Sequence, residues 1–245
     1  MSEKTVPVVA AQAVSRSYRL GAAVVPAVRD VTISIGRGEF AALQGPSGSG
    51  KTTLLNLLGL LDHADLGTVR IGGVDSGELS ENDRSDLRRD RFGFVFQTFN
   101  LIPVLSAEEN VAYPMLLAGV EKESARRRAR ELLGAVGLSD KGAVRPDLLS
   151  GGQRQRVAIA RALANQPSVV FADEPTANLD SKTADEILDL MRGICDSSGV
   201  GFLFATHDPR VVSRARRVIA LHDGRIESDE LVELNAGRGT RDAEQ

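Results

Sequence analysis

The chain has 245 residues, of which 42% are hydrophobic and 26% are charged. This composition is ordinary for a globular protein, and the length accommodates one large domain with its own core. A total of 30 basic against 33 acidic residues gives a net charge of −3, which argues against non-specific binding of nucleic acid. Because Cys195 is the only cysteine, an intrachain disulfide and a cysteine-based zinc site are both excluded.

Neither a secretory signal nor a membrane span is expected. The first nine residues include Glu3 and Lys4 and lack the apolar core of a signal peptide. The longest apolar stretches, 54–61 and 111–120, are far shorter than the run of about 18 residues that indicates a membrane span. We therefore expect a soluble chain that reaches a membrane, if at all, through a partner protein.

Short apolar runs typical of strands alternate with amphipathic runs typical of helices, which predicts an α/β fold with a largely parallel sheet. The strands are predicted, in chain order, at 40–44, 68–71, 92–96, 169–172, 202–205, 218–221 and 225–227. A glycine-rich turn after the first of them is expected to open a helix that runs through Leu61. A hairpin signal at His222-Asp223-Gly224 joins the last two strands.

Strand signals are absent between residues 97 and 149, where a helix is predicted over 121–136 with one apolar face. We expect this stretch, about 97–149, to be a helical subdomain inserted into a core formed by about 1–96 and 150–227. The whole chain, 1–245, then forms a single domain. Further helices are predicted over 154–165 and 181–197, followed by a polar, partly frayed tail over 228–245.

The most specific motif is the run Gly-Pro-Ser-Gly-Ser-Gly-Lys-Thr at residues 45–52, which fits G-x-x-x-x-G-K-[ST] between a predicted strand and helix. Glycines let successive N–H groups point at phosphate oxygens, and the helix N-terminus adds positive potential. We expect Lys51 to reach the β- and γ-phosphates and the Thr52 hydroxyl to bind Mg²⁺. The alternative is a chance glycine-rich turn. The residues expected to hold nucleotide here are Gly45, Pro46, Ser47, Gly48, Ser49, Gly50, Lys51, Thr52 and Thr53.

Two carboxylates, Asp173 and Glu174, follow the predicted buried strand at 169–172, where they are costly unless they are used. We expect Asp173 to hold Mg²⁺, directly or through water, and Glu174 to act as general base on the attacking water. Solvated acids that cap the following loop are the alternative. The phosphate loop in the same chain favours the catalytic interpretation.

A second glycine-rich turn, Leu149-Ser150-Gly151-Gly152-Gln153, precedes the predicted helix at 154–165. Its N–H groups, its hydroxyl and the helix dipole would make another anion cradle. An ordinary N-cap by Ser150 explains the same residues. Two phosphate cradles in one chain require an explanation.

The order of these motifs resembles the nucleotide-binding subunit of an ATP-binding cassette (ABC) transporter over about residues 8–227. The resemblance implies an ABC-type P-loop NTPase with a RecA-like core, a small antiparallel β region and an inserted helical subdomain. It also implies that two subunits sandwich two ATP molecules head to tail. The turn of one subunit then binds the γ-phosphate held by the phosphate loop of the other, through Ser150, Gly151, Gly152 and Gln153.

Four further site residues are carried over from the resemblance by position. Tyr18 matches the residue that stacks on adenine, and Gln97 matches the catalytic glutamine that contacts Mg²⁺ and water and links the site to the membrane partner. His207 matches the histidine that touches the γ-phosphate, and Asp180 matches the aspartate of a loop crossing the dimer interface. Structural alternatives are a core tyrosine, a structural histidine and a helix N-cap. The run Ala-Asn-Leu-Asp at 177–180 differs from the Ser-Ala-Leu-Asp that family members often have.

Residues 94–103 and 109–111 are similar to the lipoprotein-release and macrolide-efflux branch of that family. The branch implies an integral-membrane permease with four spans and a large extracytoplasmic domain. The chain is then expected to hydrolyse ATP with Mg²⁺, to pair as a homodimer or with another cassette, and to lie on the cytoplasmic inner face of the cell membrane. No nucleic acid partner is expected.

Three other functions use the same motifs. A cell-division ATPase would signal through a related permease, a solute-importer ATPase would differ in its membrane partner, and a soluble ABC ATPase would act on nucleic acid or ribosomes. Only an arginine cluster, Arg126–Arg130, in the predicted helix at 121–136 favours the last, and a solvated helix face is the favoured explanation of that cluster. The transported substrate and the direction of transport do not follow from the sequence.

Overall fold

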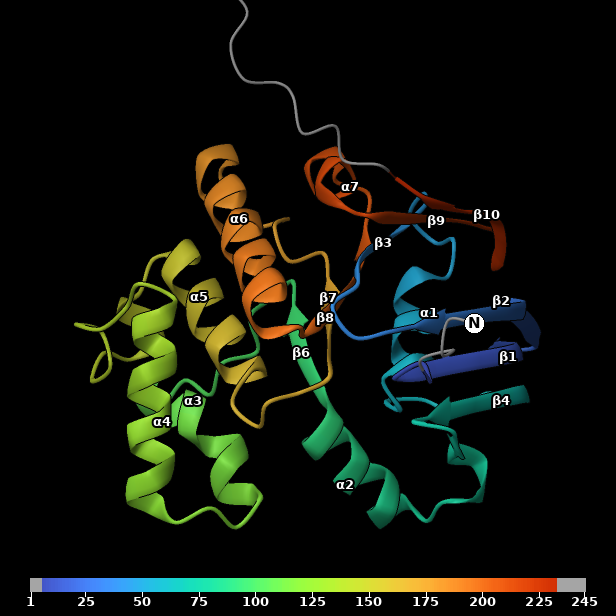
Figure 1. The fold of residues 1–245 in the computed structure, drawn as a ribbon. Helices are drawn as coiled ribbons and strands as arrows, with labels where there is room; N and C mark the ends of the chain where they lie inside the picture. Colours follow the sequence, from blue (N-terminus) through green and yellow to red (C-terminus); the bar gives the residue numbers. More distant parts are fainter. Residues whose placement is uncertain (1–5, 233–245) are drawn as a thin grey trace, which may run out of the picture.

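The computed structural model describes residues 6–232. In that range no helix has both the length and the apolar character needed to cross a membrane. Several helices lie to one side of a central sheet, and the helix Lys51–Leu58 lies on the other side together with a second, smaller sheet (Figure 1).

Six strands form the central sheet, in the order β10-β9-β3-β8-β7-β6. Their bounds are Phe40–Gln44 (β3), Phe92–Phe96 (β6), Val169–Asp173 (β7), Gly201–Thr206 (β8), Arg217–His222 (β9) and Arg225–Leu231 (β10). All neighbours pair in parallel except β9 and β10, which confirms the predicted α/β fold. Because parallel strands end at one edge of a sheet, the loops after β3, β6, β7 and β8 meet there.

Side chains alternate across the central sheet and build a core on each face. On one face, the buried rings of Phe40 and Phe204 lie 4.6 Å apart between their centroids, close to Phe202. On the other face, Leu43 and Phe171 are buried with the leucines of helix α1. Each of these fully buried side chains contributes about 1.5–3 kcal/mol, so both faces fix the strands that carry the loops.

The bounds of the helices are Lys51–Leu58 (α1), Glu81–Arg91 (α2), Ala107–Leu117 (α3), Lys122–Ala135 (α4), Gly151–Ala162 (α5), Ser181–Ser198 (α6) and Pro209–Arg214 (α7). Helices α1, α4, α5 and α6 correspond to predicted helices and α3 lies in the predicted helical stretch, whereas α2 and α7 were not predicted. No strand occurs between residues 97 and 149, all of which are described. Helix α1 stops at Leu58 rather than Leu61, because Gly59 caps it and the next residue, Leu60, turns the chain away with a left-handed φ of 58°. Helix α5 begins earlier than predicted, because Ser150 caps it.

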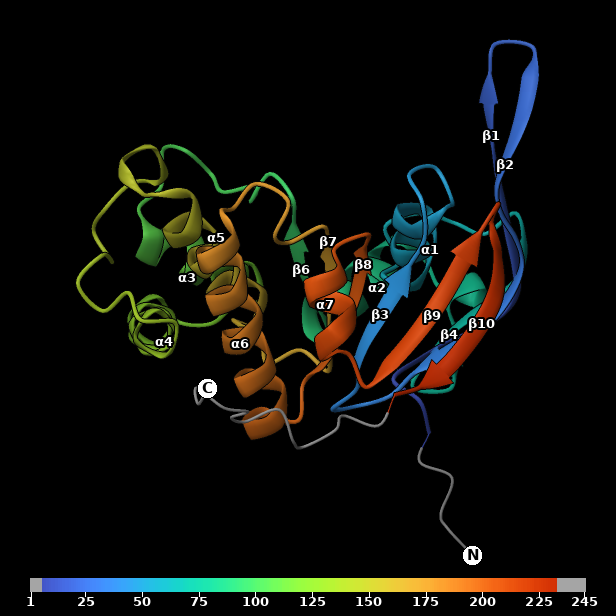
Figure 2. The same cartoon turned by 90° about the horizontal axis from the view of Figure 1, so that it is seen from above.

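The second sheet is antiparallel, in the order β2-β1-β4-β5. Its strands are Val9–Leu20 (β1), Ala23–Ile35 (β2), Leu66–Ile71 (β4) and Val74–Asp75 (β5). The hairpin of β1 and β2 projects from the body of the molecule (Figure 2). Residue patterning missed both strands, because register shifts interrupt the alternation of β1 and Ala13 has a positive φ of 52°.

The prediction of a frayed tail from Ser228 onward was wrong for its first residues. Strand β10 continues through Leu231, with Ser228 opposite Ala220 in the ladder with β9. Two charge-assisted hydrogen bonds of 2.6 Å from Arg217 to Asp229 fasten this polar edge strand. The rest of the predicted tail, from residue 233 on, lies outside the described residues.

Candidate nucleotide-binding site

The phosphate loop joins β3 to α1 in a conformation that only glycine allows at two positions. Gly50 has a φ of +102°, and a Cβ there would lie 2.2 Å from the carbonyl oxygen of Ala27. A Cβ on Gly45 would lie 2.2 Å from the carbonyl oxygen of Leu221. The loop backbone therefore packs directly against the strand β2 and the end of β9, which fixes where its N–H groups lie.

Lys51 folds back across this loop. Its Nζ donates hydrogen bonds to the carbonyl oxygens of Gly45 (2.8 Å) and Pro46 (2.9 Å), and the residue is buried. The nearby hydroxyl of Ser49 is also buried and has no hydrogen-bond partner within the described residues. A positive charge and an unpartnered donor beside a helix N-terminus form a site for an anion.

An open cavity of about 410 Å³ lies over the loop. It brings together predicted site residues from distant parts of the sequence, since its lining includes Tyr18, Lys51, Thr52, Thr53, Gln97, Glu174 and His207. Parallel topology explains this meeting, because Gln97, Glu174 and His207 each follow the carboxyl end of a central strand.

Thr52 and Asp173 meet beside this cavity. The Thr52 hydroxyl oxygen lies 3.1 Å from both carboxylate oxygens of Asp173, and Gln97 lines the same cavity. Burial raises the pKa of Asp173; the hydrogen bond from Thr52 opposes this rise and the charge of Glu174 adds to it. An all-oxygen donor set with a single carboxylate fits Mg²⁺, which takes its other ligands from water and substrate phosphates.

The raised pKa of Asp173 predicts that Asp173→Asn stabilises the nucleotide-free protein. A folded-state pKa above the unfolded value means that ionisation opposes folding at neutral pH, so a neutral amide of the same shape relieves that cost. We expect Tm to rise by about 2–4 °C while MgATP hydrolysis is lost. Calorimetry at pH 7.5 without nucleotide measures the shift, and a lower Tm would contradict it.

Glu174 is held in a strained conformation between β7 and β8. Its φ is +44°, unusual for a residue with a side chain. Its Oε1 accepts a 2.6 Å hydrogen bond from His207 Nδ1, and its Oε2 accepts a 3.0 Å bond from the Thr206 hydroxyl. The imidazole is 71% exposed, whereas the carboxylate is only 16% exposed. The structure therefore holds the Glu174 carboxylate in a fixed orientation at the cavity, next to the solvent-exposed imidazole of His207.

Tyr18 is not a core side chain. It is 36% exposed and lines the cavity. The guanidinium of Arg16 lies over its ring at 5.0 Å from the centroid, and its hydroxyl donates a 2.6 Å hydrogen bond to Asp62. Arg16 in turn forms ion pairs with Asp62 and Asp65. These charged neighbours hold the ring at the cavity wall.

The second glycine-rich turn does not join this cavity within one chain. Ser150 and Gln153 instead form a capping box at the start of α5, with reciprocal bonds of 2.9 and 3.2 Å. Asp180 caps α6 by accepting the N–H of Thr183 at 3.0 Å. Both N-cap interpretations are thus correct as local structure. If this turn binds a nucleotide, that nucleotide must be held by a second subunit.

Sequence patterning missed several residues that contact predicted site residues. Arg16 and Asp62 support Tyr18, and Thr206 contacts Glu174 from the end of β8. Thr206 had a signal, because it is the last residue of a continuously apolar strand and directly precedes His207. Arg16 and Asp62 are far apart in sequence and had none.

The fold and the cavity define a P-loop nucleotide-binding domain. The sequence model of the ABC transporter family matches residues 28–177, which is more than half of the chain. The chain therefore belongs to the ABC transporter family.

Three similar proteins indicate which members of this family the chain resembles. The lipoprotein-releasing system ATP-binding protein LolD of Novosphingobium aromaticivorans is 47% identical over 90% of this chain and 99% of its own length. The macrolide export ATP-binding/permease protein MacB of Syntrophobacter fumaroxidans is also 47% identical, over 89% of this chain, which spans only 31% of that protein. A dimeric structure of the ATP-binding cassette MJ0796 with ADP and Pi superposes with a TM-score of 0.84, at 41% identity over 94% of this chain and 100% of that one.

Proposed function

We propose that this chain is the ATP-hydrolysing subunit of an ABC transporter of the lipoprotein-release or macrolide-efflux type. The observation that supports this proposal most strongly is one cavity lined by the phosphate loop and Glu174, with the Thr52–Asp173 pair beside it. The LolD and MacB relatives support the branch.

In this proposal each polar group at the cavity has a distinct task. Lys51 and the loop amides bind the β- and γ-phosphates, and Tyr18 stacks on adenine. Thr52, Asp173 and Gln97 hold Mg²⁺, which when bound neutralises phosphate charge and orients the γ-phosphate. Glu174 takes a proton from the attacking water, and His207 turns from Glu174 toward the γ-phosphate.

Two subunits complete the two sites head to tail. Ser150, Gly151 and Gly152 supply amides and a hydroxyl to the γ-phosphate bound by the partner's loop, and Gln153 and Asp180 lie at the same interface. The dimeric MJ0796 cassette supports this arrangement, as does the position of the second turn outside the cavity of its own chain. The partner is an identical chain or a paired cassette.

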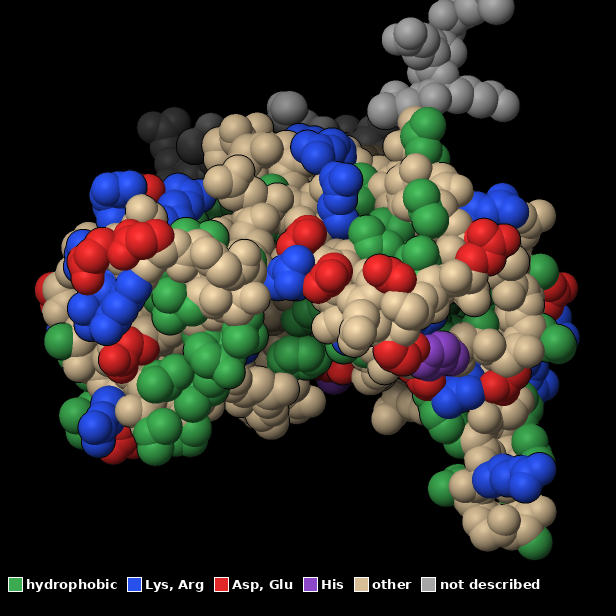
Figure 3. Space-filling view, turned by 90° about the horizontal axis from the view of Figure 1, so that it is seen from below, with side chains coloured by type: hydrophobic (Ala, Val, Ile, Leu, Met, Phe, Trp, Pro, Cys, Tyr) green, Lys and Arg blue, Asp and Glu red, His purple; other side chains and the backbone are tan. Residues whose placement is uncertain are grey.

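A second hollow supplies a docking place for the permease. A groove of about 430 Å³ lies between α2 and β6 on one side and α3 and α5 on the other, close to Gln97. Apolar side chains, among them Leu61 and Leu117, are 46% and 62% exposed in it, and Figure 3 shows hydrophobic side chains gathered on the helical part of this face. We propose that this groove binds a short segment of a four-span permease with a large extracytoplasmic domain, and that the chain lies on the cytoplasmic face of the membrane.

A charge placed in the groove tests this function. We expect Leu117→Asp to reduce the recovery of a membrane permease with the chain at least tenfold, because a carboxylate is costly in an apolar contact. Basal MgATPase activity should change less than twofold. Affinity capture from solubilised membranes with MgATP, followed by mass spectrometry, measures recovery. Val74→Asp, at a residue that is 53% exposed outside the groove, is the matched control.

The identity of the captured protein separates the remaining functions. A four-span permease with a large outer domain supports the proposal or, with a dedicated outer enzyme, the cell-division alternative. Capture of a six-span partner would instead indicate that the chain is a solute-importer ATPase. Equal recovery with both variants contradicts the groove, and a stable ATP-dependent dimer without a membrane partner favours a soluble ATPase.

The arginine cluster on α4 gives little support to the nucleic acid alternative. Arg126 and Arg130 both pair with Glu108, at 3.3 and 3.4 Å, and Arg128 pairs with Glu131 at 3.2 Å. The two carboxylates offset two of the five positive charges on that helix, which weakens attraction to a phosphate backbone.

A further inference from the structure

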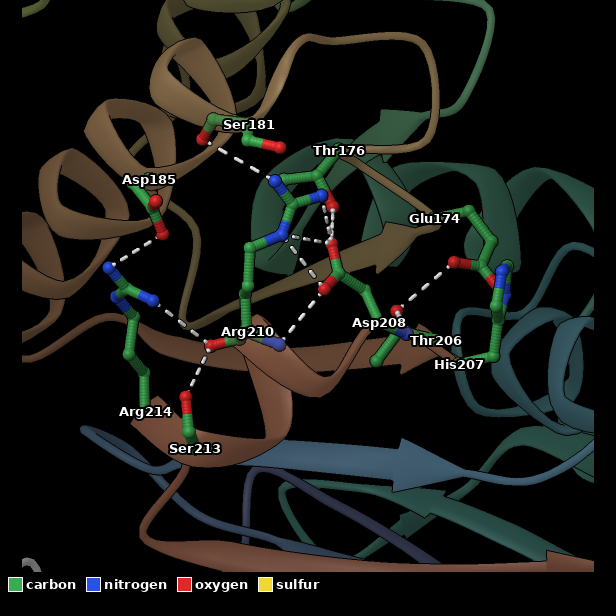
Figure 4. Close-up of polar contacts among 10 residues, drawn as sticks. All are labelled: Glu174, Thr176, Ser181, Asp185, Thr206, His207, Asp208, Arg210, Ser213 and Arg214. Carbon is green, nitrogen blue, oxygen red and sulfur yellow. Dashed lines mark hydrogen bonds and ion pairs between the residues drawn. The ribbon is translucent and has the colours of Figure 1, made fainter.

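A chain of polar contacts lies behind Glu174 (Figure 4). Thr206 is fully buried at the end of β8. Its hydroxyl oxygen accepts the N–H of Asp208 at 2.9 Å and lies 3.0 Å from Glu174 Oε2. Because the amide can only donate, the hydroxyl proton is left to point at the carboxylate. Thr206 is thus a hydrogen-bond donor of fixed direction toward Glu174.

Asp208 fixes that donor from the other side. Its carboxylate, 11% exposed, accepts a 2.8 Å bond from the Thr176 hydroxyl and bonds of 2.8–3.1 Å from the Arg210 side chain. Burial raises the pKa of Asp208, but the hydrogen bonds from Arg210 and Thr176 outweigh it and the pKa lies below its usual value. Asp208 is therefore an anion of fixed orientation at neutral pH.

The same contacts reach the segment that precedes α6. Thr176 follows Glu174 by two residues, and Arg210 Nη1 donates a 3.4 Å bond to the carbonyl oxygen of Ser181, directly after Asp180. The segment after β7 thus binds the Asp208 carboxylate directly through Thr176, and the start of α6 is linked to it through Arg210 (Figure 4).

We infer that Thr206 is the positioning residue of Glu174, and that Asp208 and Arg210 tie its orientation to the segment 176–181. The inference rests on the proposed role of Glu174 as general base. Thr206 anchors Oε2, so Oε1 is the oxygen left for water when His207 turns away. A base that rotates freely loses the geometry of proton transfer, and misplacement by about 1 Å costs on the order of a hundredfold in rate.

Two substitutions at Thr206 separate positioning from packing. Thr206→Val keeps the shape and removes the donor, and Thr206→Ser keeps the donor. We expect Thr206→Val to lower kcat about ten- to a hundredfold and Thr206→Ser to stay within about threefold of wild type. The Kd for MgADP, measured by calorimetry, should change less than twofold in both. Thr32→Val, which removes an exposed hydroxyl that accepts the N–H of Ala13 on β1, is the control and should not alter kcat.

A double-mutant cycle tests the link to Asp208. If Asp208 acts through Thr206, Asp208→Asn lowers kcat severalfold alone but changes it less than twofold in the Thr206→Val background. If the two substitutions lower kcat by factors that multiply in the double variant, Asp208 does not act through Thr206. MgADP binding shows whether each variant is folded. If Thr206→Val does not bind MgADP, Asp208→Asn is the variant that tests the proposal, and a lower kcat at unchanged Kd supports it.

The outcome for Glu174→Gln distinguishes failure of the positioning role of Thr206 from failure of the proposed ATPase function. If Glu174→Gln retains turnover, the general base is wrongly assigned and the proposed function needs revision. If Glu174→Gln is inactive while Thr206→Val retains wild-type kcat, the function stands and Thr206 is only a structural residue.

Discussion

Glu174→Gln is expected to reduce MgATP turnover about a thousandfold while ATP binding is preserved. The amide has the shape of the carboxylate, and its oxygen can still accept a hydrogen bond from Thr206 or His207. It is not basic enough to take a proton from water, and general-base catalysis contributes about 10²–10⁴ in rate. Because the γ-phosphate stays uncleaved, the ATP-bridged dimer should persist.

Phosphate release and size-exclusion chromatography with MgATP measure both effects. The matched control is Glu131→Gln, which removes an exposed carboxylate on α4 that pairs with Arg128 and should leave turnover unchanged. Turnover within about tenfold of wild type in Glu174→Gln would refute the assigned base. Loss of the dimer at unchanged ATP binding would refute the head-to-tail site.

Much of the site was predictable because parallel topology gathers residues that follow strands. Lys51, Asp173, Glu174 and His207 each lie at or just after the end of a short apolar strand, or open the helix that follows one. Strands of this kind are recognisable from continuous burial. Once the strands are placed in one parallel sheet, their carboxyl ends define the site without further information.

The remaining parts depend on contacts that local sequence does not encode. Strands β1 and β2 escape the alternation rule, since bulges and the positive φ of Asp30, 51°, shift their register. The ring of Tyr18 is held by Asp62, which lies 44 positions away. Thr206 and Asp208 are adjacent to a motif, but their role rests on hydrogen-bond directions that only coordinates give.

Local sequence is also insufficient to assign the second glycine-rich turn, at residues 149–153. The sequence around Ser150 fits both a helix cap and a phosphate ligand, and the structure shows the cap. The two roles do not exclude each other, because a capping box orders the very amides that would face a partner's nucleotide. The role of this turn at phosphate therefore depends on a second subunit, which the sequence of one chain does not place.

Lys51→Met is expected to abolish hydrolysis by removing ATP binding, in contrast to Glu174→Gln. The Lys51 ammonium is the one charge in the described chain that bonds back to the phosphate loop, through Gly45 and Pro46. It is buried, so its attraction to a phosphate is weakly screened. Methionine keeps the apolar stem but not the charge. We expect the Kd for MgATP to rise at least tenfold and turnover to fall more than about a thousandfold.

Calorimetric titration with MgATP and thermal unfolding together check this result. The substitution removes the donor to the carbonyl oxygens of Gly45 and Pro46. Because Gly45 is half-buried and Pro46 is exposed, water can replace that donor, so Tm without nucleotide should stay within a few degrees of wild type. Lys122→Met, at an exposed position at the start of α4, is the control and should bind as wild type does. If Lys51→Met keeps wild-type affinity, the loop binds phosphate through its amides alone, and the role assigned to the Lys51 side chain is refuted.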